Sequence, residues 1–400
     1  MHARSIVARV LGPCLELLHA KRAQALQRCV LGLLFAGSAS LSSIALWLPG
    51  VTRLKYRLKS VDRLLSNVAL HAQREALYAA LARGWLEGVG QVLLVVDWSD
   101  LTRDQGFHCL RASVVVEGRS VTLYEEAQPQ RLLCNLGVHR KFLDRVAKML
   151  PAGCRPIVMT DAGFHATWFN LIVQRGWHFI GRLRGRNLVR IGEASDWEPA
   201  RETYRYAEKA ARDFANACYA RSNPVSVRLV LAKCPAKGRH QFSTRGGRAK
   251  SRSSLKHARS ANEPWLLACS PGLEHLSAAA IVALYAQRMR IEESFRDTKN
   301  LRWGLGLESS GTHKVKRLDM LLLLTHLVGF VERLIGESAK QRQLELQFMS
   351  TRRRSRPEIS VVTLGRRIVD TLSPVLGCLR PWRAIQLLKV QARAACCPTT

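Results

Sequence analysis

The sequence predicts an α/β fold in which a mixed sheet is flanked by helical regions at both ends of the chain. Two unbroken apolar runs, Val92 to Val96 and Ile157 to Met159, are too short for helices and are typical of strands buried on both faces. Between them, "CLRASVVVEGRSVTLYEEA" reads as two strands that turn at Glu117-Gly118. Amphipathic helical stretches alternate with these strands, and this order is typical of a mixed α/β core.

The composition indicates a polyanionic partner. The chain has 400 residues, enough for a core with added modules, and its 62 Lys and Arg residues against 30 Asp and Glu leave a formal net charge of +32. Nucleic acid is the leading expectation, ahead of a membrane surface. A merely soluble basic protein is the alternative.

The cysteines and the apolar segments predict a cytoplasmic protein. The 11 cysteines form no CxxC pair and show no zinc-ligand spacing, so we expect reduced thiols. Residues 29–52 carry no charge, but Gly37-Ser38 predicts a turn between two short packed helices rather than a membrane span. The first ten residues do not resemble a signal peptide.

Residues 1–88 are predicted to form a helical DNA-binding domain. Apolar residues recur at helical spacing, and "RLKYRLKSVDRLL" continues as a basic amphipathic helix. Its cations Lys55, Arg57, Lys59 and Arg63 are the candidate DNA contacts. An ordinary helical bundle with a solvated basic face explains the same pattern.

Residues 89–184 are predicted to form the first part of the core. The strand in "QVLLVVDWSD" ends at Asp97, and the strand in "RPIVMTD" ends at Asp161. "KFLDRVAKML" and "HATWFNLIVQRG" predict helices, and "WHFIGRLRG" predicts a further strand. Carboxylates therefore stand at the ends of two buried strands.

Residues 185–272 are predicted to be a β-rich, basic insertion. Within it, residues 236–260 are basic and nearly free of acid, so we expect a loop that orders on a phosphate backbone. A charged loop with no role is the alternative. Strand character resumes at "EPWLLACS".

Residues 273–335 are predicted to complete the core, and residues 336–400 to form a helical C-terminal region that is a candidate for dimerisation. "RLDMLLLLTHLVGFVERLIG" predicts a long helix. Asp319, His326 and Glu332 interrupt its apolar character, which favours a buried core helix over a membrane span.

The stretch "YAQRMRIEESFRDTK", residues 285–299, predicts a helix with an unusual polar face. With Tyr285 at zero, Arg288 falls at about 300°, Glu292 at about 340° and Lys299 at about 320° on an ideal helix. Glu293 points about 100° away from Glu292. A carboxylate between two cations and a phenol suits a place where a metal ion meets phosphates. Simple Arg288–Glu292 pairing on a solvated helix would explain only two of the four residues.

These motifs resemble those of bacterial DDE transposases of the insertion-sequence family 4, and most closely the Tn-ten type of cut-and-paste transposase. That family's hallmark is Tyr, two residues, Arg, three residues, Glu, six residues, Lys, and the sequence satisfies every interval. "DWSDL" and "TDAGFH" match its two aspartate motifs. The likeness runs from about residue 50 to about residue 330.

The resemblance implies a ribonuclease-H-like catalytic core with a β-rich insertion. In it, Asp97, Asp161 and Glu292 converge as the catalytic residues and as ligands of two Mg²⁺ ions, for which Mn²⁺ can substitute. Water first nicks the element end, and the freed 3′-hydroxyl attacks the opposite strand to form a hairpin. Water then opens the hairpin, and the 3′-hydroxyl joins target DNA.

The resemblance also implies partners and supporting residues. Tyr285, Arg288 and Lys299 would contact DNA phosphate. Trp265 would stack on a flipped base, although a buried core Trp is nearly as good a reading. Met289 replaces an aromatic found in some relatives, so the second base contact is open. The expected partners are the terminal inverted repeats, target DNA, a second copy of the chain in the DNA complex, and host DNA-bending proteins in the nucleoid.

Two other functions remain open on the sequence. One is a non-catalytic DNA-binding regulator derived from such an enzyme. The other is a related metal-dependent nuclease that cuts DNA without joining it.

Overall fold

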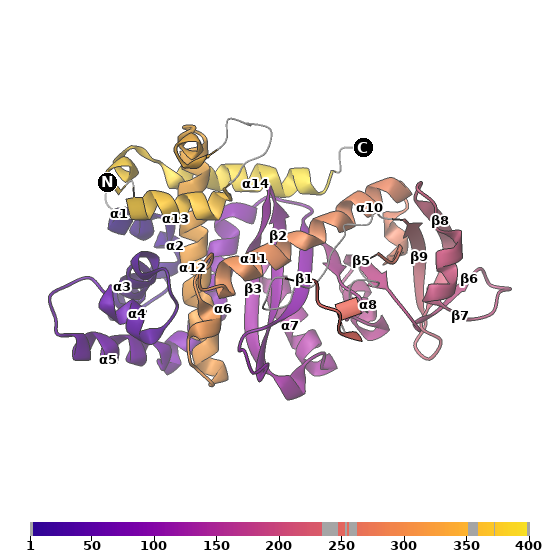
Figure 1. Cartoon of the computed structure of the whole chain (residues 1–400), viewed down its shortest axis with the longest axis horizontal. Helices are drawn as coiled ribbons and strands as arrows, with labels where there is room; N and C mark the ends of the chain where they lie inside the picture. The colour runs from indigo at the N-terminus through magenta and orange to yellow at the C-terminus, as the bar shows by residue number, and fades with distance from the viewer. Residues whose placement is uncertain are drawn as a thin grey trace. The chain divides into compact units, whose positions relative to one another are not determined.

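The computed structural model describes residues 3–233, 247–252, 254–255, 262–350, 359–371 and 373–397. Its chain divides into two compact units (Figure 1). The first contains residues up to Cys154 and residues Met289–Cys397, and the second contains Arg155–Arg288. Each unit combines helices with strands, as the predicted α/β class requires.

The N-terminal part of the first unit is helical, as expected. Its helices are α1 (Ala3–Val10), α2 (Gly12–Leu15), α3 (Ala20–Ala36), α4 (Leu41–Leu46), α5 (Leu54–Leu65) and α6 (Val68–Leu86). Gly37 adopts φ 59° after α3, a left-handed conformation that suits glycine, so the uncharged stretch from residue 29 turns where the sequence predicts. Among the described residues, none of the helices combines the length and the apolar character that a membrane span needs.

Three antiparallel strands and one helix follow in the first unit. They are β1 (Leu93–Asp100), β2 (Phe107–Val116), β3 (Arg119–Pro129) and α7 (Leu136–Met149), with a 3-10 turn at Gln130–Leu132. The strand order is β3-β2-β1, and Asp97 lies opposite Arg111 in the register of β1 and β2. Gly118, at φ 68°, makes the hairpin turn between β2 and β3 at the predicted position.

The C-terminal part of the first unit is again helical. It contains α11 (Arg290–Lys299), α12 (Val315–Lys340), α13 (Val361–Thr371) and α14 (Ala384–Ala395), with 3-10 turns at Leu307–Ser309, Leu344–Phe348, Ser373–Cys378 and Pro381–Arg383. Most residues of α12 are buried, and the helix packs against β3, α3 and α13. The predicted core helix is therefore confirmed.

The second unit is rich in strands. They are β4 (Ile157–Thr160), β5 (His178–Leu183), β6 (Leu188–Ile191), β7 (Glu198–Pro199), β8 (Arg212–Tyr219), β9 (Val225–Ala232) and β10 (Trp265–Cys269). They lie in the order β4-β5-β10-β9-β8-β6-β7, with β4 and β5 parallel and the following pairs antiparallel. The unit also contains α8 (Ala166–Val173), α10 (Ala278–Ala286) and 3-10 turns at Ala200–Tyr206 and Pro271–Leu273.

One predicted helix is broken in the structure. The segment expected as a single helix over residues 285–299 consists of the end of α10, a 3-10 turn η4 (Gln287–Met289) and α11. A 3-10 turn advances about 120° per residue instead of 100°, so one angular scale cannot run from Tyr285 to Lys299. The prediction of one continuous polar face on one α-helix was wrong, although Glu292 and Lys299 share α11.

Two further expectations concern the basic insertion and the cysteines. Much of the predicted basic loop over residues 236–260 lies outside the described residues. The ten described cysteines are all free, and half of them are buried.

Candidate active site

Asp97 lies near the end of β1, where the strand leaves the core. Leu93 to Val96 are fully buried, whereas Asp97 is only half-buried. Its Oδ1 accepts a hydrogen bond from the backbone N–H of Trp98 at 2.9 Å. The next carboxylate, Asp100, is engaged elsewhere, since its Oδ1 lies 3.0 Å from His108 Nδ1 and its Oδ2 accepts from Gln105 at 3.0 Å.

Helix α11 is tied directly to β1. The Lys299 ammonium donates to Ser99 Oγ at 2.7 Å and to the Asp100 carbonyl at 3.0 Å. Burial lowers the pKa of Lys299. The helix that carries Glu292 is therefore fixed at its last turn to the end of the strand that carries Asp97.

A buried arginine fixes the middle of α11. Arg111 of β2 donates to Thr298 Oγ1 at 3.0 Å and to Ser294 Oγ at 3.4 Å. Its guanidinium also lies 4.3 Å from the ring centroid of Phe295. One side chain of the sheet thus contacts three residues of α11, Ser294, Phe295 and Thr298.

The charge of Arg111 is balanced by Glu125 of β3. Arg111 donates to Glu125 Oε2 from Nε at 2.7 Å and from Nη2 at 2.6 Å, and both side chains are almost completely buried. Removing a pair of charges from water is costly unless both are well matched. The two hydrogen bonds to Glu125 Oε2 pair the buried charges closely. The Nη1 and Nη2 groups of Arg111 also donate to Ser294 and Thr298 of α11.

The two neighbouring glutamates of α11 have different surroundings. Glu292 is exposed and lies seven residues before Lys299, which is about two turns and hence the same face. Glu293 is engaged in ion pairs, with Arg296 at 2.7 Å and Arg119 at 3.8 Å. The assignment of Glu292 rather than Glu293 as the metal ligand stays a prediction.

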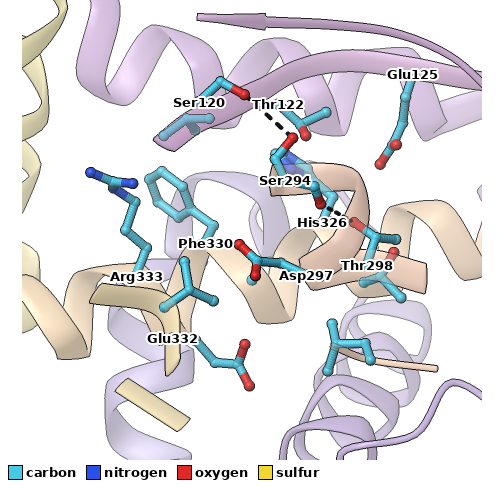
Figure 2. A pocket seen from close by; sticks show the side chains of 15 residues that line it. Ser120, Thr122, Glu125, Ser294, Asp297, Thr298, His326, Phe330, Glu332 and Arg333 are labelled. Carbon is cyan, nitrogen blue, oxygen red and sulfur yellow. Dashed lines mark hydrogen bonds between the residues drawn. The ribbon is translucent and has the colours of Figure 1, made fainter. Parts of the chain in front are cut away.

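A small cavity lined by both polar and apolar side chains lies beneath α11 within the first unit (Figure 2). It measures about 60 Å³, and its lining includes Ser120, Ser294, Asp297, His326 and Glu332. This volume holds a few water molecules but no nucleotide. The cavity therefore belongs to the support of α11 and is not a substrate site.

The walls of this cavity are held by ion pairs. Asp297 Oδ2 accepts from Arg119 Nε at 3.0 Å, and burial raises the pKa of Asp297. The buried Glu332 accepts two hydrogen bonds of 2.9 Å from Arg366 of α13. Arg366 also donates to the carbonyls of Trp303 and Gly304, in the segment that follows α11.

Asp161 lies in the second unit, directly after β4. Its Oδ1 accepts a hydrogen bond from the Gly163 N–H at 2.9 Å, which closes a tight turn. A Cβ at Gly163 would lie 3.1 Å from the same oxygen, so this close approach favours glycine. The "TDAGFH" motif is thus a strand followed by a carboxylate-centred turn.

Trp265 and Tyr285 contact each other in the second unit. Their rings are 5.1 Å apart at 81°, an edge-to-face geometry, with Tyr285 buried and Trp265 half-buried. Arg182 of β5 lies close by: it donates to the Glu263 carbonyl at 3.4 Å, and burial lowers its pKa. Arg182 belongs to none of the predicted motifs, although a cation at the end of the strand in "WHFIGRLRG" is a usable signal in the sequence.

The predicted basic helix α5 is present, and its cations differ in their roles. Lys55, Lys59 and Arg63 are exposed. Arg57 is instead half-buried, and its guanidinium donates to the carbonyls of Leu46, Gly50 and Thr52. This bonding favours a structural role for Arg57.

The candidate ligands have the chemistry that a hard cation prefers. Asp97, Asp161 and Glu292 all offer carboxylate oxygens, which suit Mg²⁺ and Mn²⁺. Asp97 and Glu292 belong to the first unit, and Asp161 to the second. Across the described part of the chain, no three His, Cys, Asp or Glu side chains are already grouped as a metal site.

Comparison with known families identifies the core. Residues 90–328, more than half of the chain, match the family described as Transposase DDE domain. The chain belongs to the DDE transposase family. The match spans the three candidate carboxylates as well as Tyr285, Arg288 and Lys299. DNA is therefore the expected substrate, and a divalent metal ion is the general cofactor of the family.

The family also accounts for the fold. This DDE transposase has the predicted α/β architecture, with a ribonuclease-H-like core, a β-rich insertion and helical regions at both ends. No curated protein matches the chain. The narrower prediction of insertion-sequence family 4 rests on the motif spacing described above.

Proposed function

We propose that this DDE transposase is a Mg²⁺-dependent cut-and-paste enzyme of the insertion-sequence family 4 type. The observation that carries the proposal is the attachment of α11 to β1 through Lys299, Ser99 and Asp100. Through it, Glu292 and Asp97 belong to one packed assembly within the first unit. A motif of four residues that merely decorated a solvated helix would not require this attachment.

Each carboxylate has a role in the proposal. Asp97, Asp161 and Glu292 would hold two divalent cations, which, when bound, activate the attacking oxygen and stabilise the leaving oxygen at phosphorus. Asp97 is presented at a strand end, Asp161 by a glycine turn and Glu292 by an anchored helix. The chain itself supplies no covalent nucleophile in this scheme.

The remaining candidates would bind the DNA. Tyr285 and Arg288 would contact phosphate through a phenol hydroxyl and a guanidinium. Lys299 would add positive charge at the end of β1 while it holds α11 in place. Trp265 would stack on an extruded base during hairpin formation, and its contact with Tyr285 would place the stacking surface beside a phosphate contact.

The substrates follow from this scheme. The enzyme would act as a homodimer on paired terminal inverted repeats and would join the freed ends to target DNA. Host DNA-bending proteins would assist pairing in the bacterial nucleoid. The order of products would be nicked ends, hairpins, reopened ends and joined target DNA.

The test incubates the purified chain with DNA from the two ends of its element and with Mg²⁺. Hairpin and joined products are expected from the wild type. Asp97→Asn and Glu292→Gln should reduce both by a factor of at least about 10³, as loss of a metal ligand at a phosphoryl-transfer site does. Glu293→Gln is the matched control on the same helix and should retain activity.

The outcomes separate the competing functions. Cleavage without hairpins or joining would indicate a metal-dependent nuclease. Binding of the DNA without cleavage would indicate a regulator. If Glu292→Gln were as active as Glu293→Gln, the assignment of the third ligand would be wrong.

A further inference from the structure

Five large apolar side chains are exposed in a short stretch of the first unit, from the last residue of α4 to the first turn of α5. We call residues 46–56 the apolar loop. Its exposed large apolar members are Leu46 at the end of α4, Trp47 and Val51 in the connection, and Leu54 and Tyr56 in the first turn of α5. Trp47 is 56% exposed and Val51 is completely exposed. Single exposed apolar residues are common, but five within 11 positions are an unusual concentration, and concentrations of exposed apolar side chains often mark contact sites.

Two arginines hold the backbone of the apolar loop in shape. Arg57 donates to the carbonyls of Leu46, Gly50 and Thr52 at 3.2, 2.7 and 2.7 Å. Arg28 of α3 donates to the Pro49 carbonyl at 3.0 Å. The loop is therefore built to present its side chains, because four of its hydrogen bonds come from charged donors.

Buried side chains anchor the loop from below. Leu48 points into the core, at 3% exposure, between the exposed Trp47 and Pro49. Trp47 itself stacks at 6.5 Å on Phe35 of α3, so one edge of its ring is supported while the rest faces solvent. A rigid aromatic side chain held in this way loses little conformational entropy when it inserts into a partner.

The rim of the apolar loop is basic. Arg53, Lys55, Lys59 and Arg63 are all exposed, and the Lys55 ammonium lies 5.0 Å from the ring centroid of Tyr56. The neighbouring carboxylate, Asp62, is paired with Arg317 at 2.6 Å. An apolar centre with a basic rim is complementary to a duplex, whose phosphates flank grooves lined by bases.

We propose that the apolar loop is a wedge that inserts Trp47 and Val51 into a groove of duplex DNA and bends it, while the surrounding cations grip the flanking phosphates. Apolar wedges in basic surroundings unstack base steps and kink the duplex. A second copy of the chain is a poorer occupant, because two basic rims would repel each other. An anionic membrane could also bind an apolar surface with a basic rim, and the test below distinguishes membrane binding from DNA binding. The proposal rests on the proposed function only in that the chain acts on DNA.

The test measures bending and affinity without metal, so that it does not depend on catalysis. Wild type is added to a mixed-sequence duplex several helical turns long that carries a donor and an acceptor dye at its ends. Energy transfer should rise on binding because the duplex bends. The double variant Trp47→Ser/Val51→Ser should bind about tenfold more weakly, within the range that stacking side chains contribute, and should not bend the duplex.

A charge variant on the same helix provides the matched control. Lys59→Ala should lower the slope of log affinity against log salt by about 0.9 and keep the bend. The double variant should lose the bend and keep the slope. Thermal unfolding of both variants checks that α4 and α5 remain folded.

Three results would overturn the proposal. One is equal bending by wild type and by the double variant. Another is loss, in the double variant, of binding to vesicles that contain phosphatidylglycerol, with DNA bending unchanged. The third is loss of self-association alone, as seen by sedimentation. Absence of hairpin products with intact bending would contradict the proposed function and leave the wedge standing.

Discussion

His326 is a buried histidine at which the stability of the first unit is sensitive to acid. Its ring stacks on Tyr78 at 4.8 Å, and it borders the cavity under α11 (Figure 2). Burial, together with a smaller effect from the positive charge of Arg111, lowers the pKa of His326 to about 3. Unfolded chain therefore takes up a proton between about pH 6.5 and pH 3 that the folded chain does not, so stability falls as pH drops through this window.

Replacing His326 should flatten this acid dependence. Proton uptake at His326 by the unfolded chain lowers the free energy of unfolding by about 2 kcal/mol at about pH 5. We expect His326→Phe to lose less stability than wild type between neutral pH and about pH 5, as measured by urea unfolding at both values. His313→Asn, at an exposed position, is the control and should behave like wild type. An unchanged pH dependence in His326→Phe would show that the acid sensitivity comes from other groups.

Helix α11 depends on the Arg111–Glu125 pair beneath it. Arg111→Met leaves the carboxylate of Glu125 buried without its partner, which should cost about 3–5 kcal/mol of unfolding free energy. The double variant Arg111→Met/Glu125→Leu removes both charges and should recover much of that loss. It should nevertheless cleave DNA poorly, since the hydrogen bonds to Ser294 and Thr298 are gone.

A double-mutant cycle of unfolding, combined with cleavage assays, tests this separation. A structural pair with no influence on Glu292 would give a double variant that is both stable and active. Activity that stays low after stability has recovered would identify Arg111 as a positioning residue for α11.

The contact between α12 and α13 depends on glycine. A Cβ at Gly365 would lie 1.7 Å from the Glu332 carbonyl oxygen, and one at Gly336 would lie 1.9 Å from that of Val361. The two helices therefore approach to a distance that no larger residue allows. Gly365→Ala must push α13 away and weaken the Arg366–Glu332 pair, so we expect a loss of about 2 kcal/mol or more.

Gly329 offers the matched control within α12. A Cβ there meets nothing within 4 Å, so Gly329→Ala should stabilise the helix by about 0.5–1 kcal/mol. Thermal unfolding of the two variants should shift in opposite directions. Equal shifts would contradict the close-packing argument.

At the scale of the whole molecule, local patterns predicted the elements better than their connections. Val92 to Val96 and the Glu117-Gly118 turn are short-range signals, and both elements form where expected. The η4 turn was missed because the apolar and polar spacing around Arg288 fits an α-helix equally well. Partners such as Arg111 and Ser294 are separated by 183 positions, and no periodicity links them.

The candidate site also has some features that the sequence predicts and others that depend on the fold. Strand-end carboxylates and the Tyr-Arg-Glu-Lys spacing are legible in the sequence because each is a local motif. The structural role of Arg57 is not, because its three carbonyl partners depend on how the preceding loop folds. A basic helix therefore indicates a DNA-binding surface without indicating which cation faces the DNA.

The C-terminal helices give the last prediction, because the sequence suggested dimerisation while their contacts lie within the first unit. Arg366 of α13 neutralises the fully buried Glu332, and Gln391 of α14 accepts a hydrogen bond from Arg333 of α12 at 3.2 Å. Ending the chain after Ser350 would leave these α12 charges without those partners and expose much of the apolar surface of α12. We expect the truncated chain to lose cooperative unfolding of the first unit, as measured by calorimetry. A truncated chain that melts like wild type but changes from dimer to monomer in sedimentation would instead assign these helices to dimerisation.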